Sequence, residues 1–251
     1  MKKCIAIICA IALLAILPAI QASAQGTITA EQIKSGLAGG NCYILSQDGS
    51  AVLVDTGTAN YRDTILEKCR QQNVRLIVIT HGHYDHVQNA AFLAKALGVP
   101  VAMHPADLPL LENILAEPIL AHRPLGKVMV WAIKLQQWPW LGKLLSWALN
   151  NEIPAFVPDI ALDDGFSLAP YGVDARVIVL PGHTRGSVGV VAGSDLLVGD
   201  AMMNILGPSE ALHYVDKTAM EASAAKVRGY EGATVWMGHG GAIHNPGAPH
   251  D

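Results

Sequence analysis

Six residues that directly follow an apolar strand constrain this chain more than any other feature. The unbroken apolar run Leu76–Ile79 has the length and composition of a strand covered on both faces. After Thr80, a single loop holds His81, Gly82, His83, Tyr84, Asp85 and His86. Imidazole and carboxylate groups are ordinary ligands of a catalytic zinc ion, and an irregular loop can turn several of them toward one point. A chance cluster of polar loop residues is the alternative, but histidine makes up only 10 of the 251 residues.

Three more ligand-type residues follow predicted strands later in the chain. His183 comes after the run Val177–Leu180, Asp200 after Leu196–Val198 and His239 after Val235–Met237. Each stands beside a glycine, which lets the backbone turn tightly and approach a site. A lone histidine more often has a structural role, but the repetition of this pattern indicates one site assembled from several strand ends.

Strands alternate with helices along most of the chain. We expect strands over residues 41–46, 51–55, 76–79, 101–103, 175–180, 187–192, 196–198 and 234–237, and helices over 61–72, 87–97 and 210–228. Residues from about 106 to 150 break this alternation with a helical stretch interrupted at Pro118, Pro124 and Pro139. Because no linker separates this stretch from the rest, the sequence predicts one α/β domain with a helical insertion.

In these residues the chain resembles the metallo-β-lactamase-fold hydrolases, with glyoxalase II-like and lactonase-like members among them. The resemblance is carried by Asp55, His81, His83, Asp85, His86, His183, Asp200 and His239. It implies an αββα sandwich with two zinc ions (Zn2+) at one edge. It further implies that His81, His83 and His183 hold the first ion, and that Asp85, His86 and His239 hold the second. Asp200 would bridge both ions together with a hydroxide, and Asp55 would orient a ligand loop.

The same resemblance implies an enzyme, a metal-dependent hydrolase. A metal-bridging hydroxide would cleave an activated acyl bond of an ester, thioester or lactone, with Asp85 and Asp200 as the catalytic residues. Three alternatives stay open: a β-lactam hydrolase, a mono-iron persulfide dioxygenase, and a non-catalytic protein that binds a lipid or metabolite. We rank lactam hydrolysis lower because two lactamase groups of this fold carry cysteine or serine where this chain has Asp200.

The N-terminus has the pattern of a secretory signal peptide. A short cationic start precedes an unbroken apolar run, and small residues end at Ala24. A membrane anchor is the alternative, but the run is shorter than the ~20 residues that span a bilayer. We expect removal of residues 1–24 by cleavage after Ala24, a metallo-β-lactamase-fold domain over 25–251, and a periplasmic or secreted protein. Of the cysteines that remain, Cys42 and Cys69, we expect two buried free thiols and not a disulfide.

Charge and the insertion bear on the expected partners. A net charge of −4 with no long basic run speaks against nucleic acid. Residues 122–150 hold four of the five tryptophans and four basic residues, with no acidic one. Basic residues beside tryptophans are typical of segments at membrane interfaces. We expect a small-molecule acyl substrate of hydrophobic character. For the insertion the leading interpretation is a lid packed on the sandwich, ahead of an acyl-chain pocket and of contact with a membrane surface.

Overall fold

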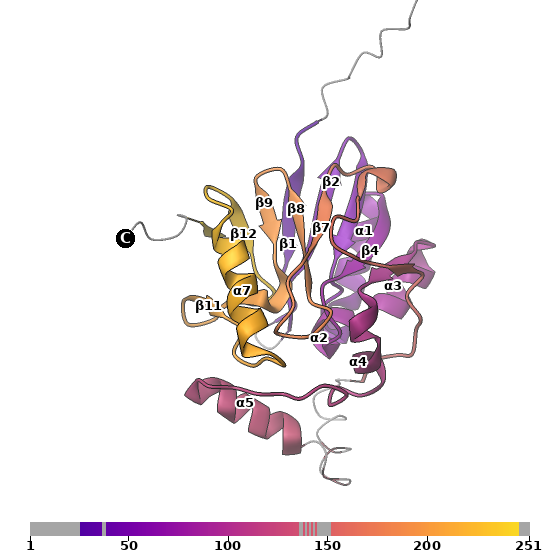
Figure 1. Cartoon of the computed structure of the whole chain (residues 1–251). Coiled ribbons are helices and arrows are strands. Elements are labelled where there is room, and N and C mark those ends of the chain that lie inside the picture. The colour runs from indigo at the N-terminus through magenta and orange to yellow at the C-terminus, as the bar shows by residue number, and fades with distance from the viewer. Residues whose placement is uncertain are drawn as a thin grey trace, which may run out of the picture.

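Two β-sheets pack face to face, and helices cover both outer faces (Figure 1). The αββα architecture predicted from the sequence is therefore confirmed. The computed structural model describes residues 26–36, 39–135, 138, 140, 142, 144 and 152–245, so the predicted signal peptide lies outside the described residues. No helix in this described part has both the length and the apolar character needed to cross a lipid bilayer.

The first sheet has six strands that lie side by side in sequence order. They are β1 (Thr29–Ile33), β2 (Cys42–Gln47), β3 (Ser50–Val54), β4 (Val74–Ile79), β5 (Val101–Met103) and β6 (Ile160–Ala161). The strands from β1 to β3 pair antiparallel, whereas those from β3 to β6 run parallel. Helices α1 (Arg62–Gln71) and α3 (Ala90–Leu97) cover its outer face with side chains such as Ile65 and Leu93. Since β3, β4 and β5 are parallel, the loops after them leave the sheet at one edge.

The second sheet has five strands in the spatial order β13-β12-β9-β8-β7. They are β7 (Arg176–Val179), β8 (Val188–Ala192), β9 (Asp195–Leu197), β12 (Thr234–Trp236) and β13 (Ile243–His244). Helix α7 (Lys217–Arg228) packs on its outer face through Ala224 and Val227. A separate hairpin of β10 (Met202–Asn204) and β11 (Pro208–Glu210) follows β9.

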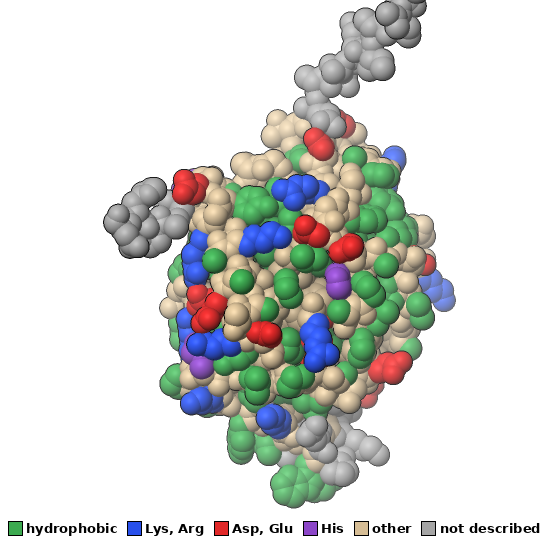
Figure 2. Space-filling model, in the orientation of Figure 1, with side chains coloured by type: hydrophobic (Ala, Val, Ile, Leu, Met, Phe, Trp, Pro, Cys, Tyr) green, Lys and Arg blue, Asp and Glu red, His purple; other side chains and the backbone are tan. Residues whose placement is uncertain are grey.

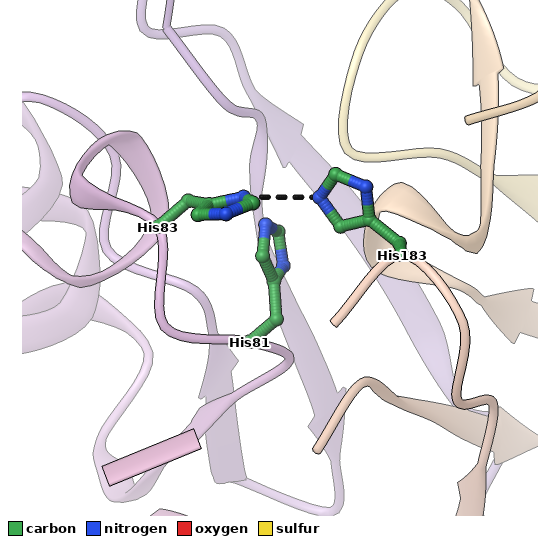
Figure 3. A group of neighbouring side chains, drawn as sticks. All are labelled: His81, His83 and His183. Carbon is green, nitrogen blue, oxygen red and sulfur yellow. Dashed lines mark hydrogen bonds between the residues drawn. The ribbon is translucent and has the colours of Figure 1, made fainter. Parts of the chain in front are cut away.

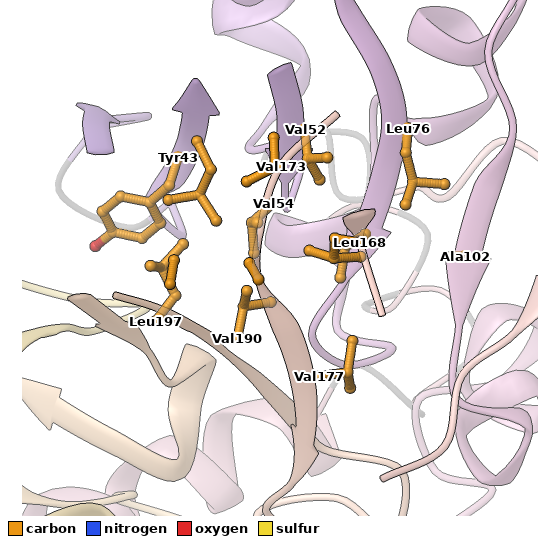
Figure 4. Packing of buried hydrophobic residues seen from close by; sticks show 14 of the residues in the cluster. Tyr43, Val52, Val54, Leu76, Ala102, Leu168, Val173, Val177, Val190 and Leu197 are labelled. Carbon is orange, nitrogen blue, oxygen red and sulfur yellow. The ribbon is translucent and has the colours of Figure 1, made fainter. Parts of the chain in front are cut away.

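The alternation of side chains along β4 explains its unbroken apolar sequence. Leu76 and Val78 point between the sheets, where they join residues of the second sheet such as Val190 (Figure 4). Ile77 and Ile79 point the other way and pack beneath the helices of the outer face. A strand buried on both faces needs apolar side chains at every position. Its sequence therefore does not distinguish the side chains that point between the sheets from those that point toward the helices.

The helix expected over residues 210–228 is shorter in the structure. It begins at Lys217, because the side chain of Asp216 caps it by accepting a hydrogen bond from the backbone N–H of Ala219 (3.0 Å). The residues before it form β11 and a loop. The strands β1, β6, β10, β11 and β13 were not predicted from the sequence. These strands have only two to five residues and lie at sheet edges or in the hairpin, so they carry little alternation to detect.

The insertion predicted to be helical over about 106–150 is helical only in part. Helices α4 (Leu108–Glu112) and α5 (Pro124–Leu135) are separated by an irregular stretch. Within that stretch, the backbone N–H and C=O of Leu120 both pair with Tyr214, at 2.9 Å each. These groups are therefore not available for helical hydrogen bonds. Most residues between 136 and 151 lie outside the described part of the chain.

Several shorter elements complete the fold. The helix expected over residues 87–97 begins at Ala90 as α3, because Val87 is instead the last residue of a separate one-turn helix, α2 (Tyr84–Val87). Single 3₁₀ turns occur at Ala59–Tyr61, Pro105–Asp107, Ala169–Tyr171 and Gly199–Ala201. Cys42 and Cys69 are both buried and free, as predicted.

Candidate metal centre

The seven residues expected to bind metal lie together at one edge of the sandwich. The loop after β4 supplies His81 and His83, whereas Asp85 and His86 lie on the one-turn helix α2 and not in the single loop expected from the sequence. The ends of β7, β9 and β12 are followed by His183, Asp200 and His239. These side chains form three overlapping groups of three, and the ligand-type atoms of each group lie within 4.8 Å of one another. Two groups are described below, and the third, His81, His86 and Asp200, shares one histidine with each of them. Segments that follow strands of two different sheets thus bring every expected ligand to one place.

The first group is formed by His81, His83 and His183, which turn their rings toward one point (Figure 3). The Nδ1 atom of His83 and the Nε2 atom of His183 lie 3.0 Å apart. The ring of His81 stands nearly perpendicular to both, with each centroid separation 4.8 Å. A tetrahedral zinc ion with Zn–N bonds of about 2.0–2.1 Å holds its nitrogens about 3.3 Å apart, so this spacing suits a single ion.

A second group is formed by Asp85, His86 and His239. The Oδ2 atom of Asp85 lies 3.3 Å from Nε2 of His239 and 3.7 Å from Nε2 of His86. The side chains of His239 and Asp85 are 17% and 9% exposed, whereas that of His86 is fully buried. The centre is therefore reached by solvent from the side of His239 and Asp85.

The carboxylate of Asp200 stands between the two groups. Its Oδ2 atom lies 3.6 Å from Nε2 of His183 in the first group and 3.4 Å from Nε2 of His239 in the second. Its Oδ1 atom lies 3.5 Å from Nε2 of His86. A carboxylate in this position could contact an ion held by either group, and this is the role that the resemblance implies for Asp200.

Asp55 sets the orientation of two of the histidines. Its Oδ2 atom accepts hydrogen bonds from Nδ1 of His86 (2.8 Å) and from the hydroxyl of Thr80 (2.7 Å). Because the Thr80 hydroxyl donates to Asp55, its oxygen can accept from Nδ1 of His81, which is 3.0 Å away. When an ion is bound, both imidazoles would therefore keep a proton on Nδ1 and leave Nε2 free to coordinate it. Asp55 itself has φ = 61°, a left-handed conformation that aspartate tolerates better than most residues.

These hydrogen bonds leave atoms of the centre that need a partner. His183 also has its Nδ1 engaged, by the backbone oxygen of His213 at 2.9 Å. Among the described residues, the buried atoms Nε2 of His81, Nε2 of His86 and Oδ1 of Asp200 have no hydrogen-bond partner. Burying a nitrogen or oxygen atom without a partner costs free energy, and coordination of a metal ion removes this cost. The residues present therefore fit a metal centre.

Glycine is required at two positions beside the centre. A Cβ atom on Gly238 would lie 2.0 Å from Oδ1 of Asp200, and a Cβ atom on Gly40 would lie 2.5 Å from Nε2 of His86. Any larger residue at Gly238 would displace Asp200. Glycine precedes His239 because of this close contact, and not only because it permits a tight turn.

Burial and the neighbouring charges give the histidines different pKa values. Burial holds the pKa of His81 and His83 well below the ordinary value, and repulsion from the other imidazoles adds to it. Burial also acts to lower the pKa of His86 and His239, but the surrounding aspartates outweigh it and raise these pKa values to about 9 and about 11. The first group is therefore neutral in the metal-free protein, whereas His86 and His239 carry protons that an incoming ion must displace.

Asp107, which was not predicted from the sequence, ties the two halves of the centre together. This residue is fully buried. Its Oδ2 atom accepts hydrogen bonds from the backbone N–H of Gly82 (3.0 Å) and from the hydroxyl of Thr184 (2.7 Å), and its Oδ1 atom accepts from the backbone N–H of Gly186 (2.5 Å). Asp107 thus joins the loop of His81 to the loop of His183. It follows β5, the parallel neighbour of β4, and that position was the signal that could have revealed it.

The class of protein follows from the fold, this centre and a match to one family. The profile of the metallo-beta-lactamase superfamily matches residues 35–239, and the chain belongs to that superfamily. Members of this superfamily are typically metal-dependent hydrolases. The clustered histidines and aspartates of the site agree with the metal-binding character of this family.

Individual relatives resemble the chain over most of its length. An uncharacterised protein of Mycobacterium tuberculosis is 33% identical over 159 residues, which are 61% of each chain. A probable metallo-hydrolase of Bacillus subtilis is 25% identical over 224 residues, 80% of each chain. A hydroxyacylglutathione hydrolase of Anaeromyxobacter dehalogenans is 27% identical over 162 residues, 64% of this chain and 45% of that one. The match thus spans about 61% of the length of the mycobacterial relative.

Solved structures show the same fold. A di-iron-bound protein, TTHA1623, is 25% identical, with a TM-score of 0.60 over 85% of this chain and 94% of its own. The B3 metallo-beta-lactamase BLEG-1 is 22% identical, with a TM-score of 0.61 over 87% of this chain and 98% of its own. At this identity the likeness to the lactamase shows the fold alone.

Proposed function

We propose that the protein is a dizinc hydrolase that cleaves an activated acyl bond of an ester, thioester or lactone. The observation that carries this proposal is the position of Asp200, whose carboxylate reaches His183 of the first group and both His86 and His239 of the second. A second complete group of ligands on the far side of a shared carboxylate is what a two-metal centre needs. A mono-iron enzyme would leave the group of Asp85 without a role.

The chain's own residues would divide the chemical work. Two bound zinc ions would supply a water of lowered pKa and would polarise the substrate carbonyl. His81, His86 and His183 are locked by their Nδ1 hydrogen bonds, so they need no reorientation during turnover. Asp85 lies at the solvent-accessible side, beside His239. Burial acts to raise the pKa of Asp85, but His86 and His239 outweigh it and hold this pKa below its ordinary value, so the carboxylate is ionised at neutral pH.

The class of substrate is supported by the kind of ligands and by the relatives. The expected ligands are imidazole nitrogens and carboxylate oxygens without a thiolate, a set that suits zinc and also iron. One relative is named as a hydroxyacylglutathione hydrolase, which acts on a thioester, and another as a probable metallo-hydrolase. Both names favour acyl hydrolysis over redox chemistry, while the di-iron relative makes iron the main alternative metal.

The proposal is tested by initial rates of the zinc-loaded protein on a matched panel. The panel holds a thioester, a long-chain lactone, an aryl ester and a β-lactam, each at the same concentration and pH. We expect a clear preference for one of the first three, because a metal-activated water attacks an activated acyl carbon with a good leaving group fastest.

The same panel on the Asp200→Ala variant is the control for contaminating hydrolases, since a contaminant would keep its rate. Negligible rates on all four compounds with two zinc ions bound would remove acyl hydrolysis as the function. Preference for the β-lactam would replace the substrate class and keep the mechanism. Iron in the purified protein, with oxygen uptake and no hydrolysis, would replace both.

A further inference from the structure

Exposed large hydrophobic side chains gather in two segments of the described chain. Eleven such residues are exposed there, and nine of them fall within residues 120–144 and 205–206. They are Leu120, Leu125, Val128, Trp131, Trp138, Trp140, Leu144, Ile205 and Leu206. Hydrophobic surface is visible at the lower end of the molecule in Figure 2, where Figure 1 places α5. Single exposed apolar residues are ordinary, but a gathering of this kind marks an interaction site.

The start of α5 and the β10–β11 turn lie side by side. A groove of about 480 Å³ runs between the start of α5 and the β10–β11 turn, and Leu125, Ile205 and Leu206 line it. Leu206 is 87% exposed at the tip of the turn. We call the surface formed by Leu125, Val128, Trp131, Ile205 and Leu206 the apolar tip.

Helix α5 already uses its inner face to hold the fold. A Cβ atom on Gly126 would lie 2.0 Å from the backbone oxygen of Leu212, so the helix packs directly on the backbone at Leu212. Val130 is buried on the same side. The outer face should then be polar, as in an ordinary surface helix. Instead Leu125, Val128 and Trp131 follow one another at helical spacing, 41%, 62% and 65% exposed.

The charged side chains of α5 have one sign. Lys127 and Lys134 are exposed on α5, and no aspartate or glutamate occurs between residues 118 and 151. Arg123 is not part of this free charge, because it pairs with Glu210 at 2.7 Å. A second copy of the chain is a poor partner for this surface, since a two-fold contact would bring the lysines of both copies together. Exposed tryptophan and leucine flanked by lysine are suited to the headgroup region of an anionic bilayer.

We propose that the apolar tip docks on the surface of a lipid bilayer that carries anionic headgroups. The apolar side chains enter the boundary between headgroups and acyl chains, and Lys127 and Lys134 contact the headgroups. This docking does not depend on which bond the metal centre cleaves.

The test is sedimentation of the metal-loaded protein with vesicles. Vesicles of phosphatidylcholine with one third phosphatidylglycerol are compared with vesicles of phosphatidylcholine alone, at low and at high salt. We expect binding to the anionic vesicles that weakens with salt. The double variant Trp131→Ser/Leu206→Ser should bind at least about tenfold more weakly, because each large apolar side chain that enters the interface contributes roughly a tenfold preference. The variant Lys127→Glu/Lys134→Glu should lose the preference for anionic vesicles.

The matched control is Val157→Ser, which removes a hydrophobic side chain that is 86% exposed but lies outside the apolar tip. It should bind vesicles as strongly as the unchanged protein does. All of the variants should have the hydrolytic rate and the thermal unfolding temperature of the unchanged protein. Absence of binding to anionic vesicles at low salt would overturn the proposal. So would equal binding by the Trp131→Ser/Leu206→Ser variant. A dimer in sedimentation velocity that this variant abolishes would assign the surface to a second copy and would equally overturn it.

Discussion

Replacement of Asp200 by alanine is expected to remove metal and turnover together. The carboxylate lies within 3.6 Å of histidines in both groups, so its loss takes a ligand from each ion. We expect the bound metal to fall from two ions toward one. The catalytic rate should fall on the order of 10³-fold or more, because the water and the carbonyl lose their shared positive field. The measurements are metal content by mass spectrometry and initial rates with the preferred substrate of the panel.

Added zinc should not restore the rate of this variant, since the missing group is a ligand. The matched control is Asp174→Ala, which removes an exposed carboxylate elsewhere in the chain. Its metal content and rate should be unchanged. An Asp200→Ala variant with two ions and full activity would show that the bridging assignment is wrong.

The second large effect is expected at Asp107, which touches no expected ligand side chain. In Asp107→Asn, one of the three donors that face the carboxylate meets an amide N–H₂ group and loses its acceptor. A buried unsatisfied donor costs about 1–3 kcal/mol, so the free energy of unfolding should fall by this amount. The two ligand loops also lose their common anchor. We expect metal affinity to fall about 10–100-fold, as it does when groups that orient ligands are removed.

The readouts for Asp107 are competition with a chelator and denaturant unfolding of the metal-free protein. Unlike Asp200→Ala, the Asp107→Asn variant should recover most of its activity at saturating zinc, because every expected ligand is still present. Glu112→Gln, an exposed change nearby in the sequence, controls for loss of one negative charge. Unchanged chelator competition in Asp107→Asn would show that the loops are held in place by other contacts.

The sequence predicted the layered fold and the residues of the centre for identifiable reasons. Strand β4 is buried on both faces, and its apolar run stands out in the sequence. The ligand-type residues come at strand ends beside glycines, so their place in the fold follows from the order of the strands. Glycine is required at position 238 because a Cβ atom there would clash with the carboxylate of Asp200.

Other features depend on contacts between distant parts of the chain, and a single sequence carries little sign of them. Asp107 is one carboxylate among many, and its partners lie 25, 77 and 79 residues away. The irregular stretch after α4 arises because Leu120 pairs with Tyr214 across the insertion. Helix α7 starts later than expected because the side chain of Asp216 caps it. A capping aspartate hydrogen-bonds to the backbone and so disfavours helix in the residues before it. Cleavage after Ala24 and a periplasmic or secreted location stay predictions from the sequence.

The central claim, a centre of two metal ions that share Asp200, is tested most directly by anomalous X-ray diffraction. Crystals of the zinc-loaded protein would be measured on both sides of the zinc absorption edge. We expect two anomalous peaks. One should lie among His81, His83 and His183, the other among Asp85, His86 and His239, each within bonding distance of the Asp200 carboxylate. A single peak in the first group, with the second group empty at saturating zinc, would contradict it.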